Sequence, residues 1–487
     1  MECVLKEYSE LVLPDQRLTK RVQKFLEAAW NSPAASLPKM FEDAVSLEGA
    51  YRLMSNERVS FDALHQPHRE RTACRAQDHG TVVVVHDTTD VETAYASPEE
   101  VGYLSTGRTG YRAHVSLAIS VELDRPARPL GVLHVETLFN RNPPSPPGTK
   151  KKPPKRQSMV HSKDKSSLRW QRGVEGCAEI LEQCSSVVHV ADREADNYAL
   201  FSEILQLGQN FVIRLRNDRI AREVDDEACD ADWSQLRTIA TELTGKFERL
   251  VPLSKRGAKG ITTRAKTHPP REARCAELSY SATHVEVQRP RPLPANDYPP
   301  TLELWLVRVW EPNPPAGEQP IEWLLLTSEP CETEAEIARV VDIYRSRWMI
   351  EDFFKALKTG CALEDRQLES RRSLLNFFAL MLPIAVHLLW LRTCARDTPD
   401  ASATEVLTPL QLTVLQHRSH RPLPKNPTAA QALWALAGIG GHLANNGWPG
   451  WQVLGRAFVT LAEAVRMWEI ATRVASEQNP PQKRLKM

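Results

Sequence analysis

The sequence predicts an α/β core that carries a mostly β insertion and is flanked by helical segments at both ends. Three observations favour this class. Short apolar, β-branched runs alternate with helical patterns from about 81 to 215, irregular strand-like sequence follows to about 320, and helical periodicity dominates both ends of the chain. At 487 residues the chain is longer than one ordinary core, which holds roughly 250–300 residues, so we expect several domains.

The first element is helical. The segment RLTKRVQKFLEAAW places Val22, Phe25, Leu26 and Ala29 on one stripe, with Lys and Arg on the opposite face. This periodicity predicts a small helical N-terminal domain over residues 1–70. A basic helix face can contact DNA, but most charged faces are simply solvated, and the pattern leaves both interpretations open.

Strand patterns begin at TVVVVHD, which ends at Asp87, and two further strands, HVSLAISVEL and LGVLHVETLF, are expected on either side of a turn at RPARP. A helix near 166–183, the strand SVVHVAD ending at Asp192, a helix near 195–206 and the strand NFVIRLR complete an alternating unit. The Pro- and Lys-rich stretch at 142–156 predicts a basic loop.

A mostly β insertion is expected at about 216–320, with LELWLVRVW as its clearest strand, and WLLLTS follows as a buried strand. The chain from about 362 onward is predominantly helical. Its apolar run LLNFFALMLPIAVHLLWL approaches the length of a membrane span, but Asn376, Pro383 and His387 interrupt it. We therefore expect a buried core helix and no membrane partner.

Composition excludes some classes of function. The chain has 62 Lys and Arg against 61 Asp and Glu, so no chain-wide charge indicates a polyanionic partner, and any such site must be local. The nine cysteines include no CxxC pair, which fits a reducing cytoplasm better than a disulfide framework or a zinc motif. We read no secretion signal at the N-terminus and expect a cytoplasmic protein.

Two aspartates close apolar strand runs, Asp87 in VVVVHDTTD and Asp192 in VVHVADREAD. An acid at the carboxyl end of a buried strand lies where α/β sheets bind ligands. The alternative for each is a turn former or a helix N-cap.

A third acid lies in YRSRWMIEDFFKALK. On one regular helix Tyr344, Arg347, Glu351 and Lys358 would share a face within about 60°. That face could bind phosphate, or it could be a salt-bridged surface with Glu351 paired to Lys358. With the two aspartates, Glu351 makes a site for Mg²⁺ or Mn²⁺ plausible, because hard cations take carboxylate oxygens.

These residues resemble a known family, the bacterial cut-and-paste DDE transposases of the insertion-sequence class to which the transposon Tn-five transposase belongs. The three acids match Asp87 in HDTT, Asp192 in DREAD and Glu351. The signature Tyr-x2-Arg-x3-Glu-x6-Lys matches Tyr344, Arg347, Glu351 and Lys358 without a gap. Weaker matches, such as EGAYRLMSNERV and GGHLANNGWPGWQVL, extend over nearly the whole chain.

The resemblance implies a ribonuclease H-like catalytic core over 71–372, a transposon-end DNA-binding domain over 1–70 and a dimerisation domain over 373–487. It implies strand cleavage with two Mg²⁺ ions per active site, for which Mn²⁺ can substitute, then a hairpin intermediate and transfer of the 3′-OH ends to target DNA. The expected partners are double-stranded transposon and target DNA and a second copy of the chain in the synaptic complex. In a bacterium, the bound protein would lie at the nucleoid.

The resemblance also implies roles in DNA contact. Trp323 matches a base-stacking tryptophan, Trp348 a second aromatic residue, and Arg214 an arginine near the cleavage site. Without the resemblance, Trp323 reads as a core residue of the WLLLTS strand. Two other classes of function stay open, namely a relative that binds ends without cutting them and a metal-dependent nuclease without a joining step.

Overall fold

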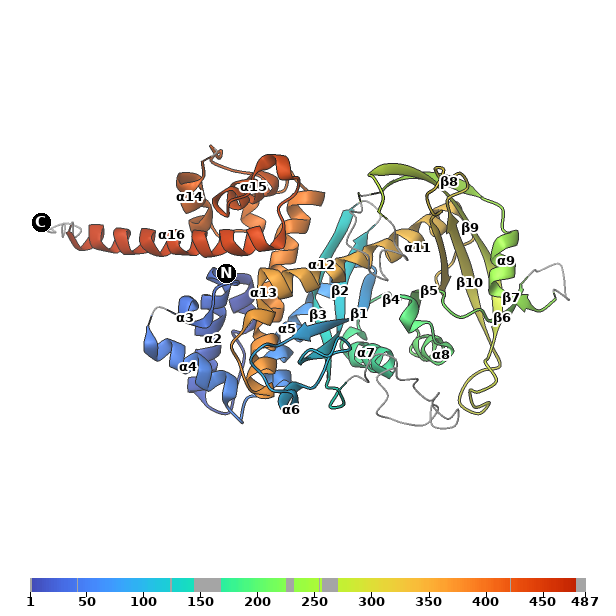
Figure 1. Ribbon diagram of the computed structural model, residues 1–487, viewed down its shortest axis with the longest axis horizontal. Helices are drawn as coiled ribbons and strands as arrows, with labels where there is room; N and C mark the ends of the chain where they lie inside the picture. Colours follow the sequence, from blue (N-terminus) through green and yellow to red (C-terminus); the bar gives the residue numbers. More distant parts are fainter. Residues whose placement is uncertain are drawn as a thin grey trace, which may run out of the picture.

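The computed structural model describes residues 2–41, 43–122, 125–143, 168–224, 232–253, 255, 270–420 and 422–478. Most of the predicted basic loop at 142–156 lies outside these residues. Within them, one sheet of eleven strands forms the centre of the molecule (Figure 1). The strands are β1 Val82–Glu92, β2 Gly110–Glu122, β3 Arg125–Leu138, β4 Val187–Ala191, β5 Asn210–Arg214, β6 Ile220–Glu223, β7 Ser234–Gln235, β8 Phe247–Leu253, β9 Arg274–Gln288, β10 Thr301–Trp310 and β11 Glu322–Thr327.

The strand order is β3-β2-β1-β4-β5-β11-β10-β9-β6-β7, with β8 paired to β9. Strands β1, β4 and β5 are parallel neighbours, and the pairings on either side of them are antiparallel. The fold is therefore a mixed α/β fold with a large mixed sheet. The predicted β insertion contributes β6 to β10, and these strands continue the sheet through the pair β10–β11.

Helices cover both faces of the sheet and form the N- and C-terminal parts of the chain (Figure 1). The longer helices are α2 Gln16–Asn31, α4 Ala44–Ser55, α5 Phe61–Gln77, α7 Arg169–Ala178, α8 Tyr198–Gln206, α9 Leu236–Glu242, α11 Glu334–Ser346, α12 Trp348–Lys355, α13 Arg371–Asp397, α14 Pro409–Arg418, α15 Ala429–Ile439 and α16 Trp451–Gln478. Shorter turns are α1 Glu2–Glu7, α3 Leu37–Met40, α6 Pro98–Val101, η3 Glu179–Leu181, η4 Arg193–Ala195, η5 Ala356–Gly360, η6 Leu363–Asp365, η7 Ala403–Glu405 and η8 Ala444–Asn446.

The predicted N-terminal helix is confirmed as α2, which buries Val22, Phe25, Leu26 and Ala29. The side chain of Asp15 caps it by accepting from the Arg17 amide at 2.8 Å. This part of the chain packs on α13, which also contacts α5, β3 and α15. The two predicted domain limits, after residues 70 and 372, fall inside α5 and α13. The division into three domains stays a prediction.

Helix α13 contains the apolar run. By length and composition it could cross a membrane, but 83% of its apolar 18-residue window is buried inside the protein. Asn376 is buried and donates to the carbonyl of Met54 at 2.9 Å, which satisfies its amide within the core. The prediction of a buried core helix is confirmed.

Two strand predictions were wrong. RPARP is part of β3, not a turn, and β3 pairs with β2 through several register shifts. Because β3 is the edge strand, prolines there remove no ladder donor that a further strand would need. Strand β1 also does not end at Asp87, since it pairs with β2 as far as Glu92 opposite Gly110.

The alternation of β1 decides which face each side chain takes. Val83 and Val85 belong to the core that includes α11, α12 and α13, whereas Val82 and Val84 belong to the core formed with η3 and the end of α7. Successive strand residues point to opposite faces. Position 87 therefore shares the face of α11–α12, and position 88 shares the face of α7.

Candidate active site

The two predicted aspartates are brought side by side by the parallel pairing of β1 and β4. The last paired residues are Val85 and Val190, and each aspartate follows two positions later. Val188 and Val190 belong to the same core as Val83 and Val85. Asp87 and Asp192 therefore continue the same face of neighbouring strands, toward α11 and α12.

Asp87 is largely buried, with 22% of its side chain exposed. The pKa of Asp87 is raised to about 6, chiefly by burial and also by the charges of Asp192 and Glu351. The Thr88 amide, which donates to Oδ1 at 2.7 Å, and the charge of Arg347 partly offset these effects. Asp87 thus lies within electrostatic reach of both other acids.

Asp192 follows the end of β4 and caps the short helix η4. Its Oδ1 accepts from the Glu194 amide at 2.8 Å. The N-cap alternative is therefore correct for Asp192 in a local sense. It does not exclude a second role, because an N-capping carboxylate that accepts one amide keeps its other oxygen for another partner.

Glu351 lies on α12 and is joined to Asp87 through Arg347. The Arg347 guanidinium donates from Nη2 to Glu351 Oε1 at 2.9 Å, and its Nη1 lies 3.4 Å from Asp87 Oδ2. Arg347 itself is buried, with 9% of its side chain exposed. One cation thus bridges a strand acid and a helix acid that are 264 positions apart in the sequence, as 351 minus 87.

The predicted single helical face is only partly correct. Helix α11 ends at Ser346, α12 begins at Trp348, and a π-helical turn, η5, follows from Ala356 to Gly360. Glu351 pairs with Arg347 and not, as the salt-bridge alternative had it, with Lys358. Lys358 lies in the π turn, where it donates to the carbonyl of Asp90 and lies 3.3 Å from Glu364.

Three further predicted residues lie near Arg347, which stands between α11 and α12. Trp323 on β11 is half-buried, and its ring meets that of Tyr344 edge-on at 5.9 Å. Tyr344 is buried, which raises its pKa, and the charges of Arg347 and Arg214 oppose that rise. Trp348 is 58% exposed beside the Arg347 guanidinium, whose carbon lies 5.2 Å from the ring centroid.

Arg214 ends β5, where it pairs with Leu325 of β11 and donates to the Glu322 carbonyl at 3.2 Å. Trp323 is partly buried on β11 and packs against the hydrophobic core, so its alternative reading as a core residue of the WLLLTS strand stays open.

The donor set fits hard divalent cations, because Asp87, Asp192 and Glu351 offer carboxylate oxygens, and the charges of the other two acids disfavour the ionised form of Asp87. In the described residues, however, no three His, Cys, Asp or Glu side chains are gathered closely enough to hold a metal ion. Arg347 lies between Asp87 and Glu351. For all three acids to bind one ion, the Arg347 side chain would have to leave its ion pairs with Asp87 and Glu351.

Sequence reasoning missed a second set of polar residues on the opposite face of the sheet. Thr88, Arg169 and Glu194 are hydrogen-bonded to one another and to the backbone segments of the two aspartates. The DREAD motif contains Glu194, but its partner Arg169 lies 25 positions earlier, and no local pattern joins the two.

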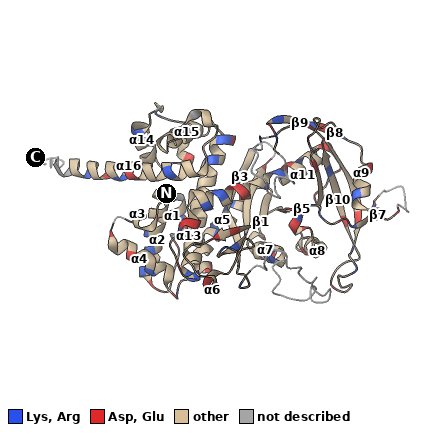
Figure 2. Ribbon diagram, viewed as in Figure 1, with Lys and Arg blue, Asp and Glu red and all other residues tan. Residues whose placement is uncertain are grey.

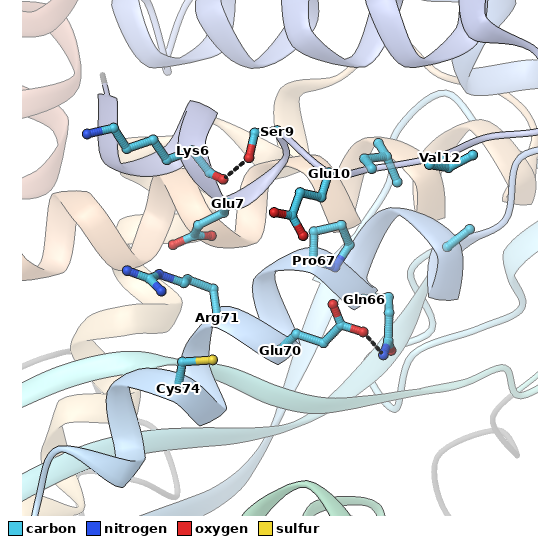
Figure 3. A pocket seen from close by; sticks show the side chains of 12 residues that line it. Lys6, Glu7, Ser9, Glu10, Val12, Gln66, Pro67, Glu70, Arg71 and Cys74 are labelled. Atoms are coloured by element: carbon cyan, nitrogen blue, oxygen red, sulfur yellow. Dashed lines mark hydrogen bonds between the residues drawn. The ribbon is translucent and has the colours of Figure 1, made fainter.

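A surface pocket lies elsewhere, between α1 and α5 (Figure 3). It is lined by residues of 6–12 and 63–74, among them Glu7, Glu70 and Arg71, and by none of the predicted site residues. Lys and Arg are interspersed with Asp and Glu over the whole molecule (Figure 2). The acids of the sheet, not a large cavity or a uniformly basic surface, therefore mark the candidate site.

A mixed α/β sheet with three acids and a facing arginine is typical of metal-dependent enzymes that break and join phosphodiesters. The comparison with family models gives the particular class. A model described as Transposase DNA-binding matches residues 2–59, and a model described as Transposase DDE domain matches residues 174–387. The chain therefore carries a transposase DNA-binding domain near its N-terminus and a transposase DDE domain, and the DDE domain indicates an enzyme that cuts DNA and transfers strands.

The match to the DDE domain covers eight of the nine predicted site residues, all except Asp87. DDE domains use divalent metal ions in general, in agreement with the carboxylate donors. The helical N-terminal region matches a DNA-binding domain over residues 2–59, while the role of its basic helix face stays a prediction.

Proposed function

We propose that this transposase binds the terminal inverted repeats of its own element and belongs to the class with the Tyr-Arg-Glu-Lys signature. It excises the element by strand cleavage through a hairpin intermediate and joins the 3′-OH ends to target DNA. The observation that carries the proposal is that Asp87 and Asp192 each follow two positions after the last paired residues of parallel β1 and β4, with Glu351 tied to Asp87 through Arg347.

Asp87, Asp192 and Glu351 are the proposed metal ligands, and two Mg²⁺ ions, replaceable by Mn²⁺, would activate the attacking oxygen and stabilise the leaving oxygen. The remaining roles belong to the protein itself. Arg347 can move from the acids to a phosphate and bind it bidentately, since its guanidinium offers two parallel donors. Lys358, held on the Asp90 carbonyl at the edge of the site, supplies a point charge.

Hairpin formation requires a sharply bent DNA end, and an extruded base can be stacked on an aromatic ring. Trp323 and Trp348 are the proposed stacking residues. Trp323 is held edge-on by Tyr344, and Trp348 offers an exposed ring next to a buried cation. Arg214, whose charge reaches Tyr344, is the proposed DNA contact beside Trp323.

A homodimer that holds two transposon ends is part of the proposal. Helix α16 extends beyond the body of the protein (Figure 1). Its far half exposes Met467, Ile470 and Val474, which lie three and four positions apart and so share a face. This face supports a C-terminal dimerisation role for 373–487, with two-fold symmetry. The proposed location is the cytoplasm of a bacterium, at the nucleoid when DNA is bound.

The test uses linear DNA that bears the inverted repeats flanking the coding region, incubated with the full-length protein and Mg²⁺. We expect nicks at the repeat ends, then hairpins, then joined product when target DNA is added. Nicked DNA without any joined product from pre-cleaved ends would instead indicate a nuclease. End binding without nicking in Mg²⁺ or Mn²⁺ would indicate a binding protein.

The matched variants are Asp87→Ala, Asp192→Ala and Glu351→Ala. Each should abolish cleavage, since each removes a proposed metal ligand, while end binding measured by gel shift stays near that of the wild type. A variant that keeps cutting would remove its residue from the proposed ligand set.

A further inference from the structure

Helix α7 lies unusually close to the sheet on the face opposite α12. A Cβ atom at Gly173 would lie 3.0 Å from His114 Nε2 and 3.1 Å from His86 Nδ1, and one at Gly176 would lie 2.3 Å from His134 Nδ1. Those imidazoles point from β1, β2 and β3 toward α7. The two glycines therefore allow the helix backbone to rest directly on a row of imidazole rings, and the N-terminal end of α7 reaches β1.

Arg169, the first residue of α7, uses this closeness. Only 8% of its side chain is exposed. Its Nε donates to Thr88 Oγ1 at 2.9 Å, and its Nη2 donates to Glu194 Oε2 at 2.8 Å. Burial lowers the pKa of Arg169, and the charges of Glu194, Asp192 and Asp87 oppose that change. Burial of this guanidinium costs desolvation free energy, and its ion-pair partner Glu194 is mostly exposed. Such a pair is weak evidence for a stabilising role, which suggests that Arg169 has a further role.

Thr88 and Glu194, which accept hydrogen bonds from Arg169, each donate a backbone amide hydrogen bond to one of the two proposed catalytic aspartates. Asp87 Oδ1 accepts from the Thr88 amide, and Asp192 Oδ1 accepts from the Glu194 amide, as described above. The Thr88 hydroxyl is fixed from a second side by His114 Nδ1 at 3.0 Å. A continuous chain of bonds thus runs from Asp87 through Thr88, Arg169 and Glu194 to Asp192.

This chain spans a gap in the sheet. The ladder between β1 and β4 ends at Val85 and Val190, so the two segments that carry the aspartates continue beyond the last paired residues. Arg169 ties these segments together from the opposite face. Its planar guanidinium offers separate nitrogens to two partners in a fixed geometry, which a single ammonium cannot reproduce.

We propose that Arg169 is a positioning residue that fixes Asp87 and Asp192 relative to each other for the strand-cleavage step. This inference rests on the proposed function and adds a device on the far face of the sheet. Arg169 does not face the α11–α12 side of the site, so it acts through Thr88 and Glu194. Loss of such second-layer partners typically lowers metal affinity or activity roughly 10–100-fold.

The test compares Arg169→Gln and Arg169→Lys with Arg172→Gln. Arg172 lies on the same helix and forms a bidentate pair with Glu136 on β3, at 2.6 and 2.9 Å, and Glu136 belongs to neither aspartate segment. It is therefore the matched control for loss of an arginine–carboxylate pair from α7. Cleavage rate at saturating end DNA, end-binding Kd and Mn²⁺ affinity by electron paramagnetic resonance are measured for each protein, together with Tm.

For Arg169→Gln we expect cleavage and Mn²⁺ affinity each to fall by roughly 10-fold or more, with end-binding Kd within about twofold of the wild type. Arg169→Lys should recover only part of the loss, and Arg172→Gln should behave as the wild type. If Arg169→Gln fails to fold, Thr88→Val and Thr88→Ser replace it. Thr88→Val removes the hydroxyl that accepts from Arg169, whereas Thr88→Ser keeps a hydroxyl. Thr88→Ser should therefore cleave DNA faster than Thr88→Val.

Wild-type cleavage and Mn²⁺ affinity in Arg169→Gln would overturn the proposal. So would an equal loss in Arg172→Gln, which would indicate a general effect on α7, or a loss confined to end binding, which would indicate a DNA contact. If the wild type itself does not cut, the proposed function fails, and the Mn²⁺ titration still tests Arg169. If the wild type cuts and Arg169→Gln equals it, only the role of Arg169 fails.

Discussion

Acid should destabilise this protein through histidines that are buried in neutral form. His65 on α5 is buried, and its Nε2 lies 3.0 Å from the Val132 carbonyl, to which it donates. The pKa of His65 is lowered to about 3, chiefly by burial and also by the neighbouring charges of His68, Arg69 and His134, while the bond to Val132 opposes them. His65 is therefore neutral in the folded protein throughout the neutral range.

His387 on α13 has the same property in a different place. Its ring packs on Trp30 of α2 with centroids 3.9 Å apart. His387 is partly buried, and desolvation is the chief cause that lowers its pKa to about 3. A backbone hydrogen bond with Val406 and the charge of Glu7 act in the opposite direction. Protonation would place a cation inside the contact between α2 and α13.

The sign follows from proton binding. Below about pH 6.5, the ordinary histidine pKa, the unfolded chain binds protons that the folded protein does not, so the free energy of unfolding falls as the pH falls. Between pH 7.5 and 5.5 each such histidine costs about 1.4 kcal/mol, and the two together about 3 kcal/mol. The result does not depend on whether the folded pKa is 3 or 4, because both lie well below pH 5.5.

Urea unfolding at pH 7.5 and 5.5 measures this loss in the wild type, His65→Gln, His387→Gln and the double variant. Glutamine cannot titrate, so each single variant should lose about 1.4 kcal/mol less than the wild type between the two pH values, and the double variant about 3 kcal/mol less. The control is His420→Gln, which changes an exposed ring and should keep the wild-type loss. Equal losses in the wild type and in both single variants would refute the reasoning.

Two further substitutions test the packing and the site. Gly173→Ala should lower the free energy of unfolding in urea by about 1–3 kcal/mol, because the new methyl group would press on buried, hydrogen-bonded imidazoles. The control is Gly438→Ala, where nothing lies within 4 Å of the new Cβ atom, and this variant should be neutral or stabilised by up to about 1 kcal/mol. Equal effects of the two substitutions would contradict this account. Trp348→Ala should change the free energy of unfolding by no more than about 0.5 kcal/mol but slow hairpin formation roughly 10-fold or more. The control is Trp448→Ala, which also removes an exposed ring and should leave the rate of hairpin formation unchanged. An unchanged rate of hairpin formation in Trp348→Ala would rule out its proposed stacking role.

The sequence was sufficient to predict that Asp192 follows the end of its strand, since an acid after a β-branched apolar run is a local signal. It could not predict that β1 continues past Asp87. That continuation depends on pairing with β2, which lies about 20 positions further along the chain and carries Arg112 and His114 opposite Asp90 and Thr88. Polar residues in the second half of β1 resemble a loop until their partners are known.

The helix that carries Glu351 illustrates a second limit. The regular period of 3.6 residues predicted one continuous face, but the regular helix is interrupted at Arg347 and widens into a π turn at Lys358. No Gly or Pro between 334 and 358 signals either change. Arg347 is held by Asp87 on another strand, and Lys358 by the Asp90 carbonyl, so long-range contacts accompany the local geometry.

One register explains why the two faces of the sheet can act together. Because side chains alternate along β1, Asp87 faces Arg347 and Glu351, and Thr88 faces Arg169 and α7. The amide of Thr88 bonds the Asp87 carboxylate, so a displacement of Thr88 on one face is transmitted to the acid on the other. The fold therefore determines the position of Asp87, a proposed catalytic acid, from both sides, and packing on the α7 face of the sheet is expected to influence catalysis on the other face as directly as contacts with DNA do.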